Sequence, residues 1–207
     1  MYVEPVHVEF GDGRESLQLR AGNGRRPVIR LLDWQTSQPD ALTVSGKGGD
    51  RFVLDGVMVT GRGVQVSGDL KQLTIRHATL VPGWGVDSHC EPQRPAEPSL
   101  EVFSPNVCVT IEHSIVGSIQ ISPVLPVPAD DVSVSTLAPD AEVQQARCEC
   151  IGPDVRLDPI RLCISDSIVD ATGRESEAIG AAGCPVAHAV LTIARSTVIG
   201  QVQIREI

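Results

Sequence analysis

Aromatic side chains are scarce in this sequence. Phe, Trp and Tyr make up 3% of the 207 residues, with two Trp and one Tyr. Because sugar rings stack on Trp or Tyr, this composition disfavours an extended sugar-binding groove. The hydrophobic residues, 42% of the chain, are instead built mainly from Val, Ile, Leu and Ala, and β-branched residues favour strands over helices.

Positive charge and long apolar runs are also lacking. The 17 Lys and Arg face 26 Asp and Glu, a formal charge of -9, which should repel nucleic acid and anionic membranes. Charges, Pro and Gly interrupt every apolar run before it reaches membrane-spanning length, and MYVEPVHVEFGDG does not resemble a signal peptide. Six cysteines are too few for a disulfide scaffold and favour a reducing compartment such as the cytoplasm. We expect a soluble chain with no nucleic-acid and no membrane partner.

A short pattern, apolar-x-apolar-x-x-(small or apolar)-x-apolar, occurs five times. The copies are FVLDGVMV from Phe52, LTIRHATL from Leu73, VTIEHSIV from Val109, LCISDSIV from Leu162 and LTIARSTV from Leu191. Three continue into a further strand, VQV from Val64, IQI from Ile119 and VQI from Val202. Stacking such units in register buries the apolar face of each strand. The pattern predicts an all-β fold, a right-handed parallel β-helix (solenoid). A leucine-rich horseshoe is disfavoured because its LxxLxL asparagine signature is absent.

The spacing of the copies predicts the organisation of the chain. Residues 1–27 are expected to form lead-in or cap strands, and 28–207 the β-helix with loop excursions at 82–99 and 122–159. The second excursion leaves open a further degenerate coil around VSVS. The chain stops on the strand VQIREI without a polar cap, so we expect it to be truncated there or covered by another subunit. Excursions from repeat folds often bind partners.

Aligning the copies places polar residues in columns. One column holds alternating charges, namely Asp55, Arg76, Glu112, Ser165 and Ala194, and we interpret it as a structural ladder. The next holds Gly56, His77, His113, Asp166 and Arg195. Two imidazoles beside a carboxylate could bind a metal or act as acid and base, although a solvated turn is favoured.

A catalytic reading of the columns depends on carboxylates. Gln65, Gln120 and Gln203 form the column of the further strand and, with Trp84 of the first excursion, are candidate binding residues. Amides cannot act as nucleophile or general base, whereas glycoside hydrolysis needs two carboxyl groups about 5 Å or about 6.5–9.5 Å apart. The remaining candidates for catalysis are Asp166 and Asp170, with His113.

The cysteines suggest a metal site only as an alternative. His89 and Cys90 in the first excursion, with Cys148 and Cys150 in the second, could bind zinc and join the two loops. Their spacing is not the usual CxxC, so a disulfide from Cys90 to Cys148 or Cys150, or free thiols, is favoured. No cofactor is predicted.

Several segments carry a family resemblance. LTIRHATLVPGWG, IEHSIVGSIQI, DPIRLCISDSIVDATG and AVLTIARSTVIGQVQI, within residues 26–207, resemble an uncharacterised family of bacterial parallel β-helix proteins that is sometimes labelled phage-tail-like. The similarity rests on the TLVPG and SIVDATG turns. It implies a structural segment of a larger protein, with further coils beyond Ile207, and it supplies no catalytic residues.

Together these features predict a non-enzymatic structural or partner-binding module of a larger bacterial protein, phage-tail-like or on a cell surface. Its partner would be another protein or further coils of the same chain; a homo-oligomer and a glycan ligand stay open. The alternative is a polysaccharide-active lyase or hydrolase. The cellular location stays open between the cytoplasm and a phage-tail-like particle.

Overall fold

The structure is a computed structural model that describes residues 2–3, 6–33, 38–81, 87–89, 94, 97–121, 159–181 and 187–205. All of the regular secondary structure among these residues is β-strand. The described part of the chain accordingly holds no helix long and apolar enough to cross a membrane.

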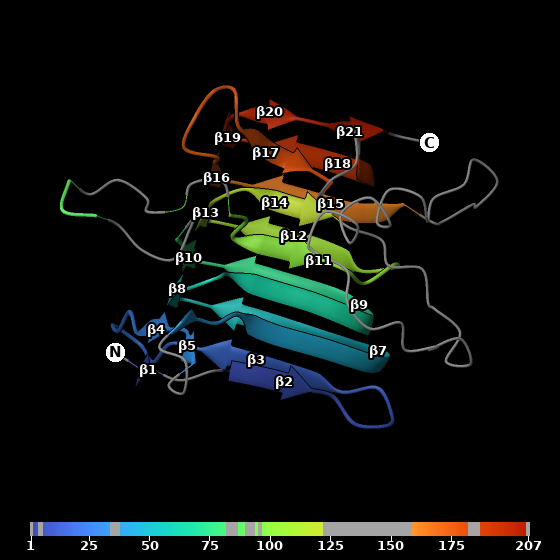
Figure 1. Ribbon diagram of the computed structural model, residues 1–207. Helices are drawn as coiled ribbons and strands as arrows, with labels where there is room; N and C mark the ends of the chain where they lie inside the picture. The colour runs from blue at the N-terminus through green and yellow to red at the C-terminus, as the bar shows by residue number, and fades with distance from the viewer. Residues whose placement is uncertain are drawn as a thin grey trace, which may run out of the picture.

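Two parallel sheets contain almost all of the strands (Figure 1). The large sheet has twelve strands: β2 (Val6–Glu9), β3 (Ser16–Arg20), β7 (Leu42–Asp55), β9 (Val64–Arg76), β11 (Leu100–Val102), β12 (Cys108–Glu112), β14 (Ile119–Ile121), β15 (Ile160–Ser165), β17 (Glu177–Gly180), β18 (Ala187–Ala194), β20 (Gln201–Val202) and β21 (Ile204–Arg205). The small sheet has seven: β1 (Tyr2–Val3), β4 (Val28–Arg30), β8 (Met58–Thr60), β10 (Thr79–Leu80), β13 (Ile115–Val116), β16 (Ile168–Asp170) and β19 (Thr197–Ile199). A separate antiparallel pair joins β5 (Leu32–Asp33) to β6 (Gln38–Pro39).

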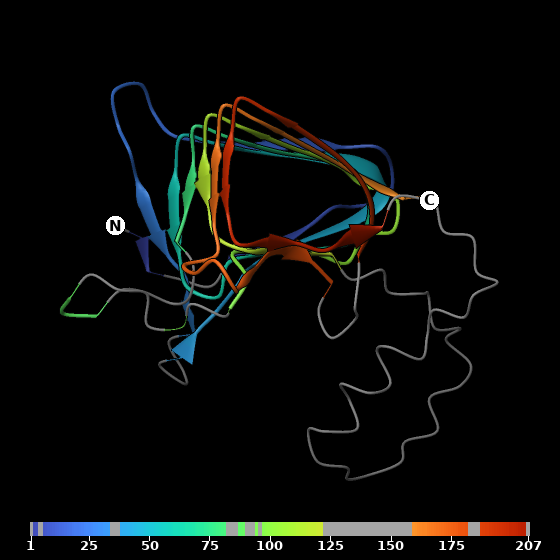
Figure 2. The same cartoon turned by 90° about the horizontal axis from the view of Figure 1, so that it is seen from above.

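The predicted right-handed β-helix is contradicted by this arrangement. The large sheet curves as a half-barrel around the interior, and the small sheet, a second sheet of parallel strands, closes the open side (Figure 2). The sequence suggested three short strands per unit, but β7 and β9 each run on through two of them and fuse two strand sets into one sheet. Large parallel sheets are typical of α/β folds, although the described residues here contain strands alone. The fold is therefore an all-strand, repeat-like parallel-sheet fold and not the predicted solenoid.

Glycines let the two long strands bend without ending. Gly46 and Gly68 lie opposite each other in the β7–β9 pair. A Cβ on Gly68 would come within 2.2 Å of the Gly46 carbonyl oxygen, so the two backbones approach more closely than any side chain would permit. Just beyond, the pairing register shifts at Asp50, whose buried carboxylate accepts hydrogen bonds from the amides of Glu15, Lys47 and Gly48.

The core lies between the sheets and follows the predicted period of two. Leu73 and Ile75 of β9 are completely buried and lie in register with their equivalents in β12, which in turn pair with those of β15. The same positions in β18 are less covered: Ile193 is 41% exposed, whereas its neighbour Ile164 is 1% exposed. The described residues place no strand beyond β18 at this position, so its apolar face is covered from one side only.

The excursions add no strand between the copies that they separate. β9 pairs directly with β12, and β12 pairs directly with β15, each over five residues in register. One copy was missed near the N-terminus, because Leu17 and Leu19 of β3 pair with Phe52 and Leu54. Residues 1–27 thus include a full partner strand of the large sheet. The domain limits themselves stay a prediction.

Candidate functional site

The polar side chains that were singled out lie where the chain leaves the large sheet for the small one. We call the two predicted polar columns at this junction the turn ladder. The register confirms the first of them, because Asp55 pairs with Arg76, Arg76 with Glu112, and Glu112 with Ser165. The turn ladder is therefore a continuous row of side chains from successive parallel strands.

The second column consists of residues with left-handed backbone. Their φ angles are 74° at Gly56, 50° at His77, 47° at His113, 50° at Asp166 and 49° at Arg195. Non-glycine residues rarely adopt this conformation, and Asp and His are enriched among those that do. The turn itself therefore accounts for part of the choice of residue at these positions.

Serines one position further along join the turns of neighbouring copies. The Ser114 hydroxyl donates to the Glu112 carbonyl at 2.7 Å and accepts from the Ala78 amide at 3.1 Å. Ser167 repeats this pattern with Ser165 and Ser114. This buried row of serines was not predicted from the sequence, although its signal is the Ser that follows His113 and Asp166 in the copies.

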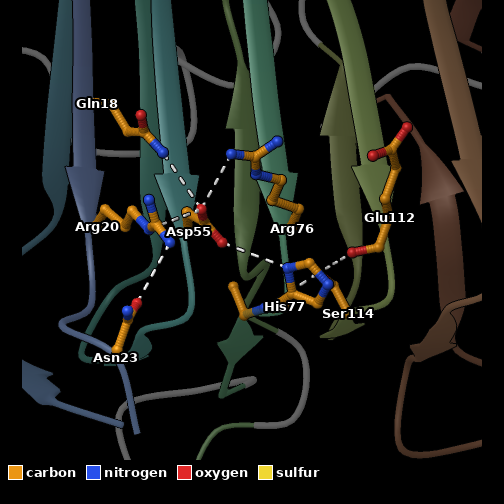
Figure 3. Close-up of polar contacts among 9 residues, drawn as sticks. Gln18, Arg20, Asn23, Asp55, Arg76, His77, Glu112 and Ser114 are labelled. Carbon is orange, nitrogen blue, oxygen red and sulfur yellow. Dashed lines mark hydrogen bonds and ion pairs between the residues drawn. The ribbon is translucent and has the colours of Figure 1, made fainter. Parts of the chain in front are cut away.

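Asp55 is the centre of the turn ladder (Figure 3). Its carboxylate accepts hydrogen bonds from Gln18 Nε2 at 3.2 Å, Arg76 Nη2 at 3.1 Å and His77 Nδ1 at 3.3 Å. Arg20 Nε lies 3.6 Å away as a further ion pair. Burial alone would raise the pKa of Asp55, but the hydrogen bonds from His77 and Arg76 and the charges of Arg76 and Arg20 outweigh it and lower the pKa. Asp55 is therefore an ionised carboxylate surrounded by donors.

The two histidines meet as the sequence predicts. The rings of His77 and His113 stack with centroids 5.3 Å apart and planes 9° from parallel. This contact requires that no further strand lies between the two copies at this position, as the direct pairing of β9 with β12 shows. His77 is also bonded to a carboxylate, through Nδ1 to Asp55.

Asp166 is held by Arg195 of the next copy. Arg195 donates from Nε and Nη2 to the two carboxylate oxygens, each at 2.6 Å. These hydrogen bonds, helped by the charges of Arg195 and His113 and partly opposed by desolvation, lower the pKa of Asp166. Asp166 therefore stays ionised near neutral pH and does not have the raised pKa of a general acid.

Asp170 has a local role in a turn. It ends β16, whereas Asp166 precedes that strand. Its Oδ1 accepts the Thr172 amide at 2.8 Å, and Thr172 has a left-handed φ of 64°. An Asp side chain that bonds the backbone two residues on is a common way to form a turn. Its role as a catalytic partner of Asp166 stays untested.

The Gln column differs from the prediction. Gln65 pairs with Glu101, and Glu101 pairs with Gln120. Glu101 therefore lies between the two amides, and Gln65 Nε2 donates to its Oε2 at 2.5 Å. Gln120 next faces Gly180, and the Gln203 amide donates to the Ile179 carbonyl at 2.8 Å, which continues the column past Gly180 to Gln203. The alignment missed Glu101 because the first excursion separates β11 from β10.

Glu177 is a carboxylate that the sequence did not suggest. Burial raises its pKa, which is the direction that a general acid needs. It pairs with Gln201 across the β17–β20 contact, away from the turn ladder. No sequence motif marks it, and a single such group does not make an acid–base pair.

The loop candidates lie largely outside the described residues. This holds for Trp84, Cys90, Cys148 and Cys150. His89 is described and exposed, and its amide donates to Asp87 Oδ1 at 2.8 Å. Within the described residues no group of three or more His, Cys, Asp or Glu is placed to hold a metal ion. The zinc alternative and the role of Trp84 stay predictions.

Two cysteines are described, and both are free thiols. Cys108 and Cys163 are half-buried on the large sheet. Cys163 pairs in register with Thr110 of β12 and Thr192 of β18.

Comparison with known proteins adds no relative. Neither the protein-family models, nor the curated proteins, nor the solved structures match the chain. The phage-tail-like family resemblance therefore stays a prediction.

Proposed function

We propose that the protein is a non-enzymatic module that presents a rigid parallel-sheet surface to a protein partner, as part of a larger bacterial assembly of the phage-tail-like or cell-surface kind. The observation that carries this proposal is the internal pairing of the turn ladder. Asp55 is bonded by Gln18, Arg76 and His77, and Asp166 by Arg195.

The hydrogen bonds and ion pairs within the turn ladder can serve a structural role. Removing one member of such a network leaves the others without partners, whereas the intact network fixes the register of successive strands. The ladder links β3, β7 and β9 through Asp55, and the last two copies through Asp166 and Arg195. These contacts support a scaffold role for the junction.

The same contacts disfavour polysaccharide cleavage. An acid–base mechanism needs one carboxyl group with a raised pKa near a second, available carboxylate. Asp166 has a lowered pKa and a bidentate cation, and Asp170 bonds its own turn. Glu177, whose pKa is raised by burial, lies on β17 away from both of these carboxylates' turns and supplies no acid–base pair with them.

A turnover assay tests the proposal. The purified full chain is incubated with neutral and acidic polysaccharides, and new reducing ends and unsaturated products are measured across pH 4–9. We expect no activity above that of a heat-treated sample. Turnover that is lost in Asp166→Ala or Asp170→Ala, and kept in Asp12→Ala at an exposed carboxylate outside the ladder, would establish the enzyme instead.

A further inference from the structure

A groove of about 780 Å³ lies on the large sheet, before the strands reach the turn ladder. Its floor follows the column immediately before each sequence copy, in which Arg51 pairs with Gln72, Gln72 with Cys108, and Cys108 with Arg161. Lys71 and Asp69, from the bend of β9, line the same groove. The groove therefore crosses successive copies of the repeat.

The groove is cationic in an acidic protein. Arg51, Lys71 and Arg161 line it and are exposed. Among the described residues of the lining Asp69 is the one acidic residue, so these residues carry a formal charge of 3 − 1 = +2. The whole chain carries -9. Among the described residues, none of the three cations has an ion-pair partner within 4.0 Å. This contrasts with Arg76 and Arg195 of the turn ladder, which are both paired.

The spacing of the cations suits an extended ligand. Arg51 and Arg161 are three register steps apart, which at the usual separation of paired strands is about 14 Å. An extended peptide rises about 3.3 Å per residue, so four to five residues cover this length. Arg can bond a carboxylate through two parallel N–H groups, which gives such contacts direction as well as charge.

The lining favours a peptide over other polyanions. The described residues of the lining include no aromatic side chain on which a sugar ring or an unpaired base could stack. Gln72 and Asn106 supply amide groups, which both donate and accept, as a peptide backbone requires. The overall negative charge opposes the long-range approach of nucleic acid, whereas a short acidic segment needs only the local field.

We propose that this groove binds an acidic peptide segment of a partner protein, with the carboxylates of that segment against Arg51, Lys71 and Arg161. The proposal rests on the partner-binding function proposed above and names the surface and the chemistry of the partner.

Titration with a synthetic peptide tests the groove. A fluorescein-labelled hexaglutamate peptide is titrated with the full chain, and anisotropy is followed at low and at physiological salt. We expect saturable binding that weakens as salt rises, and no binding of the matched hexaglutamine peptide. Equal binding of both peptides, or no binding of hexaglutamate at low salt, would overturn the proposal.

Charge-removing variants locate the site. We expect the double variant Lys71→Gln with Arg161→Gln to weaken hexaglutamate binding at least tenfold. Arg174→Gln, at an exposed arginine outside the groove, should leave the affinity unchanged. An equal loss in both variants would indicate a non-specific charge effect and would overturn the assignment. Circular dichroism confirms that each variant is folded.

A graft variant separates the groove from the neighbouring excursion. Residues 103–107 connect β11 to β12. Because Val102 pairs with Ile121 and Cys108 with Arg161, residues 122–160 are the equivalent stretch of sequence in the next copy. Replacing residues 122–158 with Phe-Ser-Pro, the sequence of 103–105, keeps Pro159 and the groove cations. Retained hexaglutamate binding supports the site on the described residues, and its loss would overturn it.

Competition identifies the class of ligand. Polygalacturonate and a single-stranded oligonucleotide are tested against the bound peptide, and tighter binding of either would overturn the peptide assignment. The failure of this proposal can be distinguished from failure of the proposed function. Absence of peptide binding with no polysaccharide turnover removes only the groove assignment, whereas turnover removes the non-enzymatic function itself.

Discussion

The same parallel strands contribute to two chemically different regions. At the turn ladder the carboxylates of Asp55 and Asp166 are bonded by cations from neighbouring copies. At the groove, Arg51, Lys71 and Arg161 lie on one surface, and Asp69 is the one acidic residue among the described residues of the lining. Strands that stack in register therefore do not form a binding site by register alone. Identical strand spacing gives a closed network where charges alternate, and an anion-attracting surface where they do not.

The largest effect should come from the core that both regions share. Ile111 of β12 is fully buried, and Ile111→Ala should lower the free energy of unfolding by about 2–5 kcal/mol through lost burial and a residual cavity. Ile115→Ala, at a position 47% exposed on the small sheet, is the matched control and should change it by less than about 0.5 kcal/mol. Urea denaturation measures both. Equal effects would show that the interior is not packed as described.

Asp55→Asn should break the turn ladder without touching the groove. It removes the charge that Arg76, Arg20 and His77 share, at a cost of about 1–2 kcal/mol, since these partners are partly exposed. The pKa of Asp55 is lowered by folding, so its contribution is full above the ordinary value of 3.8 and is lost as pH falls below it. Stability measured from pH 7 to pH 2 should therefore fall less steeply in the variant. Asp69→Asn, in the groove, serves as the control and should keep the wild-type profile.

A smaller effect is expected from the backbone of the ladder. His113 has a φ of 47°, which glycine adopts freely and a β-branched residue strongly resists. His113→Gly should therefore be more stable than His113→Val by about 1–3 kcal/mol. Thermal unfolding of the two variants measures this difference. Equal stability would remove the turn as the reason for the residues in this column.

Much of the repeat could be predicted, because it depends on local periodicity. The alternation of Leu73 with Ile75, and its recurrence in the later copies, correctly gave the buried face and the columns of the turn ladder. The fold class was wrong for a physical reason. Gly46 and Gly68 suggest breaks in the chain, yet their close approach is what lets β7 and β9 bend and continue.

The groove could not be found from the aligned pattern. Arg51 and Arg161 lie one residue before the start of their copies and are therefore outside the repeated hydrophobic pattern that was aligned. Lys71 belongs to the bend of β9 and reaches the same surface only because that strand continues. Glu101 was missed for a related reason, since long excursions hide the strand that returns after them. Pairing across such insertions depends on tertiary contacts that a single sequence does not display.

Hydrogen exchange with and without hexaglutamate tests the contrast between the two regions most directly. We expect slower exchange of the amides of Asn106, Cys108 and Arg161 when the peptide is bound, and unchanged exchange of the amides of His113 and Asp166. Slower exchange at His113 and Asp166, or at neither region under conditions where the peptide binds, would contradict this expectation.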